Sequence, residues 1–209
     1  MNKVSDVIPG LNGLVLTGGG SRRMGFDKAG IHYQDKPHAL YLFQILSLFC
    51  EETYISCRMD QRHLWRDLPV LVDEYEDIGP MAAFFSAFKK RRNAGWLIVG
   101  CDYPLINKSV IEILIKGRDT SFDISFLTPS HEERYQPLLA IWEKTSLRVI
   151  EEQHKNEDFS LRNCMRKLRT HAVQIEDANI LFNANTPSDM EEALNLLKNR
   201  DLPKNNKTS

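Results

Sequence analysis

Short apolar runs alternate with amphipathic stretches along this chain of 209 residues. The apolar runs have the length of single strands, and the stretches between them follow the 3.6-residue period of helices. Such alternation is typical of β-α-β units around a mostly parallel sheet. The expected strands are residues 14–16, 53–57, 69–72, 96–99, 123–127 and 137–142. The expected helices are residues 38–50, 79–88, 108–116, 144–154, 160–169 and 187–198.

This order of elements predicts an α/β fold, a three-layer Rossmann-like sandwich with a mostly parallel central sheet. Hydrophobic residues make up 42% of the chain, which is enough for a real core. No internal repeat or long linker divides the sequence, so we expect residues 1–198 to form one domain. Residues 199–209 are polar and short of apolar side chains, which predicts a disordered tail.

Three of the expected strands end at a polar feature. The first ends in a glycine-rich segment, the third at Asp73, and the fourth at Cys101 and Asp102. The strand ending at Asp73 is all apolar, which predicts that it is buried in the sheet. Open α/β sheets bind ligands at the carboxyl ends of their strands. We therefore expect these three features to converge on one site.

The glycine-rich segment, residues 16–28, reads LTGGGSRRMGFDK. Glycines let backbone N–H groups approach phosphate oxygens, and Arg23 and Lys28 can add charge-assisted bonds. The residues expected to contact a nucleotide here are Leu16, Thr17, Gly18, Gly19, Gly20, Ser21 and Lys28. A P-loop requires lysine where Phe26 stands, and the dinucleotide fingerprint requires glycine where Arg23 stands. A plain surface turn needs only glycine and serine, and it leaves the cations unexplained.

Charge and cysteine usage exclude several other classes. The chain has 27 basic and 28 acidic residues, which argues against indiscriminate binding to nucleic acid or membranes. No stretch approaches the roughly 20 apolar residues of a membrane span, and the first residues do not resemble a signal peptide. The four cysteines show no metal-binding spacing and no disulfide framework. We therefore expect reduced thiols, a cytoplasmic location, and no nucleic-acid or membrane partner.

The pattern Leu-x-Gly-Gly-x-Ser-x-Arg-Met-Gly-x-Asp-Lys resembles the signature loop of the molybdenum cofactor guanylyltransferases, in the nucleotidyltransferase superfamily. The resemblance continues through most of the chain, and the combination of six motifs in the family's order makes it specific. The other matching segments are Lys36-Pro37, Asp73 with Gly79-Pro80, Cys101-Asp102-Tyr103-Pro104, Gln136-Pro137-Leu138 and Asn183-Ala184-Asn185-Thr186-Pro187.

The resemblance implies a nucleotidyltransferase (GT-A-like) fold and transfer of GMP from GTP to the phosphate of molybdopterin. It implies that Arg23, Lys28 and Asp102 are catalytic, with Asp102 as the ligand of Mg²⁺, a cation that prefers a few carboxylates plus phosphates. The remaining nucleotide contacts that it implies are Ser56, Asp73, Gly79 and Pro80. Each has a simpler alternative: Asp102 and Asp73 as turn or helix-capping residues, and Ser56 as an ordinary strand residue.

The acceptor is expected to contact Asn183, Asn185 and Arg162. Asparagine amides offer both donors and acceptors to a polar heterocycle, and arginine suits a phosphate. The alternative for the asparagines is an Asx-turn that starts the last helix, with Thr186 as its N-cap. Arg162 belongs to a run of cations whose common explanation is a solvated helix face; its other members are Arg166, Lys167 and Arg169.

The sequence departs from the family pattern at two places. Ala83 stands where the family has a glycine beside the nucleotide, and a looser, more polar stretch, residues 29–32, follows Lys28. Neither departure touches the residues expected to hold phosphate or metal. We expect any effect to fall on nucleotide affinity or on the fit of the acceptor.

Other functions fit the same motifs. A cytidylyltransferase would use CTP, but the Gly18-Gly19 pair favours guanine, because cytidine-using relatives more often carry alanine before the second glycine. Transfer to a sugar or polyol phosphate is disfavoured by the short chain and the Asn-x-Asn-Thr-Pro segment. A non-catalytic adaptor that delivers cofactor would not need both cations and both aspartates. The resemblance also implies transient contacts with a molybdenum-insertion protein and recipient molybdoenzymes.

Overall fold

The structure is a computed structural model that describes residues 6–17, 33, 36–75, 77–130 and 134–201. The strands in this part of the chain are β1 (Leu11–Leu16), β2 (Thr53–Cys57), β3 (Val70–Val72), β4 (Gly95–Gly100), β5 (Ile124–Pro129), β6 (Leu139–Trp142) and β7 (Thr170–Ile175). They form one sheet in the order β3-β2-β1-β4-β6-β5-β7. Neighbours pair in parallel except around β6, which is antiparallel to both β4 and β5.

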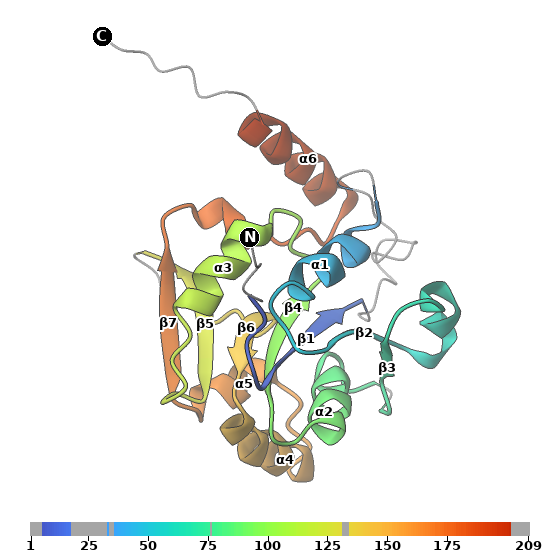
Figure 1. Cartoon of the computed structure of the whole chain (residues 1–209), viewed down its shortest axis with the longest axis vertical. Helices are drawn as coiled ribbons and strands as arrows, with labels where there is room; N and C mark the ends of the chain where they lie inside the picture. Colours follow the sequence, from blue (N-terminus) through green and yellow to red (C-terminus); the bar gives the residue numbers. More distant parts are fainter. Residues whose placement is uncertain (1–5, 18–32, 34–35, 76, 131–133, 202–209) are drawn as a thin grey trace, which may run out of the picture.

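Helices cover both faces of this sheet, so the expected three-layer sandwich is confirmed (Figure 1). The helices are α1 (His38–Leu46), α2 (Met81–Lys90), α3 (Lys108–Lys116), α4 (Leu147–Lys155), α5 (Leu161–Arg166) and α6 (Pro187–Asp201). Three short 3₁₀ segments are η3 (Met59–Trp65), η4 (Lys144–Ser146) and η5 (Ala178–Leu181). No helix in the described ranges combines the length and the apolar character that a membrane crossing requires.

The two faces of the sheet form two separate cores because side chains alternate along each strand. In β1, Val15 packs with α1 and α3, whereas Leu14 and Leu16 pack with α2, α4 and α5. All three side chains are almost fully buried. The central strands are therefore apolar on both faces, as parallel sheets covered by helices usually are.

The last helix lies outside these two layers (Figure 1). It packs through Ala193 against Tyr33 and Ala184, which form a small apolar cluster. Near its end, Arg200 donates to the carbonyl oxygen of Leu105 (3.2 Å) and pairs with Asp177. The helix consequently extends to Asp201, three residues past the predicted end at Lys198.

One expectation about the strands was wrong, and one strand was missed. The strand at residues 69–72 was expected to be buried, but β3 is only half-buried because it forms one edge of the sheet. The opposite edge, β7, was not predicted at all. Its exposed face carries polar residues such as Gln174, so its sequence lacks the continuous apolar run of the inner strands.

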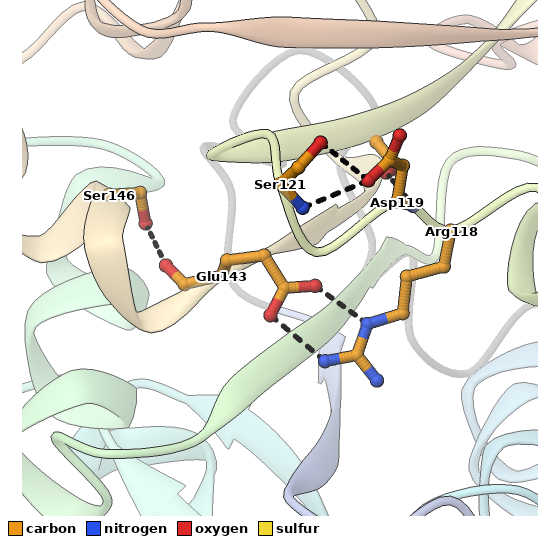
Figure 2. Close-up of polar contacts among 6 residues, drawn as sticks. Arg118, Asp119, Ser121, Glu143 and Ser146 are labelled. Carbon is orange, nitrogen blue, oxygen red and sulfur yellow. Dashed lines mark hydrogen bonds and ion pairs between the residues drawn. The ribbon is translucent and has the colours of Figure 1, made fainter.

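A buried ion pair fixes the amino-terminal side of the sheet. The guanidinium of Arg118, just after α3, donates from Nε and Nη2 to the Glu143 carboxylate (2.6 and 2.9 Å), and both side chains are largely buried (Figure 2). The hydroxyl of Ser146 donates to the Glu143 carbonyl oxygen at 2.7 Å. A Cβ at Gly95 would lie 3.0 Å from both charged groups, so a larger residue at this strand position would push against the ion pair.

We predict that Glu143→Gln lowers the free energy of unfolding by about 3 kcal/mol, because it leaves the buried Arg118 charge without its counter-charge. Denaturant unfolding measures the loss. The matched control is Glu151→Gln, which removes an exposed pair with Arg92 (2.8 Å) and should cost under about 1 kcal/mol. Equal losses in the two variants would contradict a special role for the buried pair.

Candidate functional site

The carboxyl ends of β1, β2 and β3 bring Thr17, Ser56 and Asp73 into one hydrogen-bonded row. The Thr17 hydroxyl donates to the Ser56 carbonyl oxygen (2.8 Å), and the Ser56 hydroxyl donates to Asp73 Oδ1 (2.7 Å). The backbone N–H of Asp73 donates to the carbonyl oxygen of Cys57 (2.9 Å). Ser56 is therefore more than an ordinary strand residue, because its side chain orients the Asp73 carboxylate.

Burial raises the pKa of Asp73 to about 6, against the opposing effects of the Ser56 hydrogen bond and the positive charge of Arg58. The carboxylate is thus ionised at neutral pH although its surroundings disfavour the charge. Asp73 does not cap α2, whose N-cap position is occupied by Pro80. Functional groups are often carboxylates that stay ionised although burial disfavours their charge, and Asp73 lies at the edge where α/β sheets bind ligands.

Asp102 follows β4 and is held by residues from the far end of the chain. Asn183 Nδ2 donates to Asp102 Oδ2 (2.6 Å), and the backbone N–H of Ala184 donates to the Asp102 carbonyl oxygen (2.9 Å). Asn185 Nδ2 in turn donates to Asn183 Oδ1. The structure thus brings together the aspartate and both asparagines predicted for the site.

Other residues provide the helix caps that were the simpler explanations for these side chains. The N-cap of α3 is Asn107, whose Oδ1 accepts from the backbone of Val110 (3.1 Å), so Asp102 does not cap that helix. Thr186 does cap α6, as expected: its hydroxyl accepts from the backbone N–H of Asp189 (3.2 Å), whose carboxylate accepts from the Thr186 N–H (2.8 Å). Asn183 is therefore available to hold Asp102.

Buried polar contacts fix the chain around Asp102, and sequence reasoning assigned no site role to the residues that make them. The Tyr103 hydroxyl donates to Gln136 Oε1 (2.9 Å), and His38 Nε2 donates to the Tyr103 carbonyl oxygen (3.0 Å). Burial lowers the pKa of His38 to about 4, so the ring is neutral at pH 7 and carries its proton on Nε2 for this bond. Gln136 and Tyr103 stand in the motifs, but only the tertiary contacts reveal this function.

Gly79 and Pro80 form the entry to α2. Gly79 has a φ of 61°, a conformation that favours glycine, and Pro80 occupies the N-cap position, one residue before the predicted place in the first turn. No hydrogen bond within the described residues joins either of them to Asp73 or Ser56. Ala83, which replaces the family's glycine, is buried in the core with Leu14, so its methyl group fills core space.

The predicted cationic run near α5 does not act as one group. Arg166 donates to Asn163 (2.9 Å), and Arg169 lies 3.8 Å from the buried carboxylate of Asp123. Arg162 is exposed near the start of α5, and no hydrogen bond within the described residues joins it to Asp102 or Asn183. Burial and Asp102 raise the pKa of the Tyr103 hydroxyl, while Asn183, Arg134 and Arg162 act to lower it.

The remaining predicted residues of the glycine-rich segment, Gly18, Gly19, Gly20, Ser21, Arg23 and Lys28, lie outside the described residues. Of the predicted contacts at its start, Leu16 has a buried side chain and offers only its backbone. The carbonyl oxygen of Leu16 accepts from the N–H of Cys101 (3.1 Å), which binds the end of β1 to the end of β4. The described part of the site therefore consists of the strand ends and the residues that directly follow them.

Comparison with known proteins agrees with this geometry. Residues 13–173 match the family model described as the MobA-like NTP transferase domain. The chain belongs to this family. The family's name describes transfer from a nucleoside triphosphate. The matched range contains all the described strands apart from the first two residues of β1 and the last two of β7.

Individual relatives agree with the family match. A molybdenum cofactor biosynthesis bifunctional protein from Synechocystis is 44% identical over half of this chain, which spans only 31% of that longer protein. A probable molybdenum cofactor guanylyltransferase from Pelotomaculum thermopropionicum is 28% identical over 90% of this chain and 93% of its own length. The crystal structure of molybdopterin-guanine dinucleotide biosynthesis protein A from Archaeoglobus fulgidus has a TM-score of 0.74 at 20% identity, covering 90% of this chain and 99% of that one. The nucleotidyltransferase fold is thereby confirmed.

We predict that Asp73→Asn stabilises the protein by roughly 1 to 2 kcal/mol at pH 8, because it removes a charge whose pKa is raised to about 6. The unfolded chain loses this proton near its ordinary pKa of 3.8, whereas the folded chain keeps it until about pH 6. Stability from this group is therefore intact below the lower pKa and declines as the pH rises through the window between them. Asparagine still accepts the Ser56 hydrogen bond.

Urea unfolding of both proteins at pH 3.5 and pH 8 measures the effect. The difference between them should be small at the lower pH, where aspartate is mostly protonated in both states. A constant difference at both values would show that Asp73 does not titrate as its burial indicates.

Proposed function

We propose that this protein transfers GMP from GTP to the phosphate of molybdopterin, releasing pyrophosphate and forming the guanine dinucleotide cofactor. The observation that carries the proposal is the hydrogen bond from Asn183 to Asp102 at the carboxyl edge of the sheet, next to the row formed by Thr17, Ser56 and Asp73. The names of the Pelotomaculum and Archaeoglobus relatives support the same reaction.

The chemistry requires alignment and charge neutralisation more than covalent participation by the protein. An acceptor phosphate oxygen forms a bond to the α-phosphorus, and the bond to the β-phosphate oxygen breaks as pyrophosphate leaves. In the proposal, Arg23 and Lys28 hold the triphosphate, and backbone N–H groups of Gly18, Gly19, Gly20 and Ser21 contact its oxygens.

Asp102 is the proposed ligand of Mg²⁺, and its setting fits that cation. It is a carboxylate at the strand ends, oriented by an amide donor on Oδ2 as metal-binding carboxylates commonly are. The described residues contain no group of three or more histidine, cysteine or acidic side chains that would form a protein-only cage. A single carboxylate with substrate phosphates is the usual arrangement for Mg²⁺, which supplies charge neutralisation at the α-phosphate.

Asp73 supports guanine over cytosine as the base. Guanine presents two adjacent N–H donors on one edge, which an ionised carboxylate can accept together, whereas cytosine has no such pair. Ser56 keeps Asp73 oriented through its hydroxyl at 2.7 Å. The Gly18-Gly19 pair favours the same base on the basis of the family resemblance.

The same proposal places the reaction in the cytoplasm, with transient contacts to a molybdenum-insertion protein and to recipient molybdoenzymes. Four buried free thiols, Cys50, Cys57, Cys101 and Cys164, fit a reducing compartment.

The decisive experiment incubates the purified chain with Mg²⁺, molybdopterin and GTP, CTP or ATP, and follows pyrophosphate release. We expect release with GTP. Release with CTP alone would establish the cytidylyltransferase alternative. Absence of release with all three would overturn the proposal that the protein is an enzyme, and it would favour a nucleotide-binding delivery protein.

We further predict that Asp102→Asn lowers turnover by at least about 100-fold, because it removes the metal-binding charge. The substituted amide still accepts from Asn183, so the thermal unfolding midpoint should change little. The control is Asp119→Asn, which should retain full activity. This exposed carboxylate accepts from Ser121 in the turn before β5, at the edge of the sheet opposite to Asp102. Normal turnover in the Asp102 variant would mean that another residue holds the metal.

A further inference from the structure

Tyr33 is buried near the turn that carries Asp102, but it has no role in the site described so far. Its side chain is only 9% exposed and belongs to a small apolar cluster with Ala184 and Ala193. Ala193 lies on α6, which is outside the two layers of helices on the sheet (Figure 1). The ring of Tyr33 is therefore part of the packing that holds the last helix on the rest of the molecule.

Two donors fix the backbone after β4, and both pack with Tyr33. The backbone N–H of Ala184 donates to the carbonyl oxygen of Asp102 (2.9 Å), and His38 Nε2 donates to the carbonyl oxygen of Tyr103 (3.0 Å). Ala184 is in the cluster with Tyr33, and the rings of Tyr33 and His38 pack nearly at a right angle with their centroids 5.3 Å apart. Two consecutive carbonyl groups are thus held by donors that share one packing neighbour.

The segment that orients the Asp102 carboxylate depends on the same packing. Asn183 Nδ2 donates to Asp102 Oδ2 (2.6 Å), and the backbone N–H of Asn185 donates to the carboxylate of Asp189 in the first turn of α6 (2.7 Å). The segment is therefore tied to the start of this helix. Ala193 is fully buried in the cluster, so loss of the neighbouring ring would leave a void on the face by which α6 docks.

An ordinary core position is the simpler explanation of a buried tyrosine, but the cluster of Tyr33 is separate from the two large cores. Aromatic side chains such as Phe84 and Trp142, whose ring centroids are 4.8 Å apart, pack between the sheet and its helices. The cluster of Tyr33 instead has three buried members in the described part of the chain, and two of them lie on or next to α6. Truncation of Tyr33 should consequently disturb α6 and the turn after β4 more than the sheet.

We propose that Tyr33 is a positioning residue, whose ring keeps α6 and His38 in the places from which Asp102 and Tyr103 are held. This inference deepens the proposed function, and its catalytic consequence rests on that function. Tyr33 contacts no reacting atom; it acts through Asp102, whose carboxylate becomes free to rotate if Asn183 withdraws with the helix. The contacts that carry the proposal are made by the ring, so phenylalanine should replace Tyr33 without loss.

Hydrogen exchange of the free protein, without metal or nucleotide, tests this packing directly. In Tyr33→Ala we expect the amide of Ala184 to lose at least about 10-fold of its protection, because its N–H no longer has a fixed acceptor. The amides of β2 should keep their wild-type protection. Tyr33→Phe should exchange like the wild-type protein at Ala184.

Steady-state transfer assays give the catalytic measurement. We expect Tyr33→Ala to lower kcat by about 10- to 100-fold, since a small displacement of a group that aligns the reaction has a large effect on rate. The nucleotide Kd, measured by equilibrium titration without Mg²⁺, should stay within about twofold, because the loss falls on the chemical step. Tyr33→Phe should retain kcat.

Tyr54→Ala is the matched control, because Tyr54 is also 9% exposed but packs in a large core, with its ring centroid 6.1 Å from that of Trp96. It should lower the thermal unfolding midpoint without a selective change in exchange at Ala184. Thermal unfolding also checks that each variant is folded, and Tyr33→Val and Tyr54→Val serve if the alanine variants are not.

Unchanged exchange at Ala184 in the folded Tyr33 variant would overturn the inference, whatever its activity. An equal loss of protection at Ala184 in the Tyr54 variant would also overturn it, because the loss would then be a general effect of stability. A rise in the nucleotide Kd that matches the fall in kcat would assign Tyr33 to nucleotide binding instead. Absence of transfer by the wild-type protein with every nucleotide would remove the proposed function, and exchange at Ala184 would then decide the positioning role by itself.

Discussion

The hydrogen bond between Asn183 and Asp102 is the contact on which the rest of the site depends. It joins residues 81 positions apart and brings the segment before α6 to the end of a central strand. Ala184 strengthens the connection through its backbone, and Tyr33 packs on the same residue. A short-chain carboxylate at a strand end is ordinarily free to rotate, but here a distant amide selects its orientation.

Buried neutral groups and buried charged groups have different functions around this contact. His38 is uncharged and donates to the Tyr103 carbonyl oxygen, so it fixes the backbone after Asp102 without adding charge to the site. Asp73 keeps its charge despite burial, with help from Ser56 and Arg58. The backbone after Asp102 is therefore held by a neutral hydrogen bond, whereas the buried charge belongs to Asp73 at the strand ends.

Sequence patterns predicted the fold well where burial is uniform. The inner strands and α3 have apolar runs or periodic faces that leave little choice, and residues 53–57 and 108–116 match β2 and α3 without adjustment. The edge strands β3 and β7 were harder to predict, because each has a neighbouring strand on one side only. Their side chains are partly exposed to solvent, so they lack the uniform apolar pattern of the inner strands. For the same reason the end of α6 at Asp201 depends on Arg200 reaching Leu105, a contact that no local pattern records.

The aspartates of the site were predictable from their position after strands, whereas their supports were not. Buried polar residues such as Gln136 and His38 look unremarkable in sequence, since their value comes from one partner that is distant along the chain. Asp102 itself could have been the N-cap of the following helix. Only the structure shows that α3 starts after Asn107, which caps it, so this explanation for Asp102 is excluded.

The reversed direction of β6 divides the sheet into two parts that can change independently. On one side of β4 all strands run parallel and are separated by helices, so each loop at the site is anchored by a full crossover. On the other side, β5 and β6 are antiparallel neighbours, so the chain between them reverses its direction at the carboxyl edge. A change of length between β5 and β6 would leave the parallel strands on the other side of β4 in register. The architecture thus allows one half of the sheet to vary during evolution without disturbing the strand pairing of the other half.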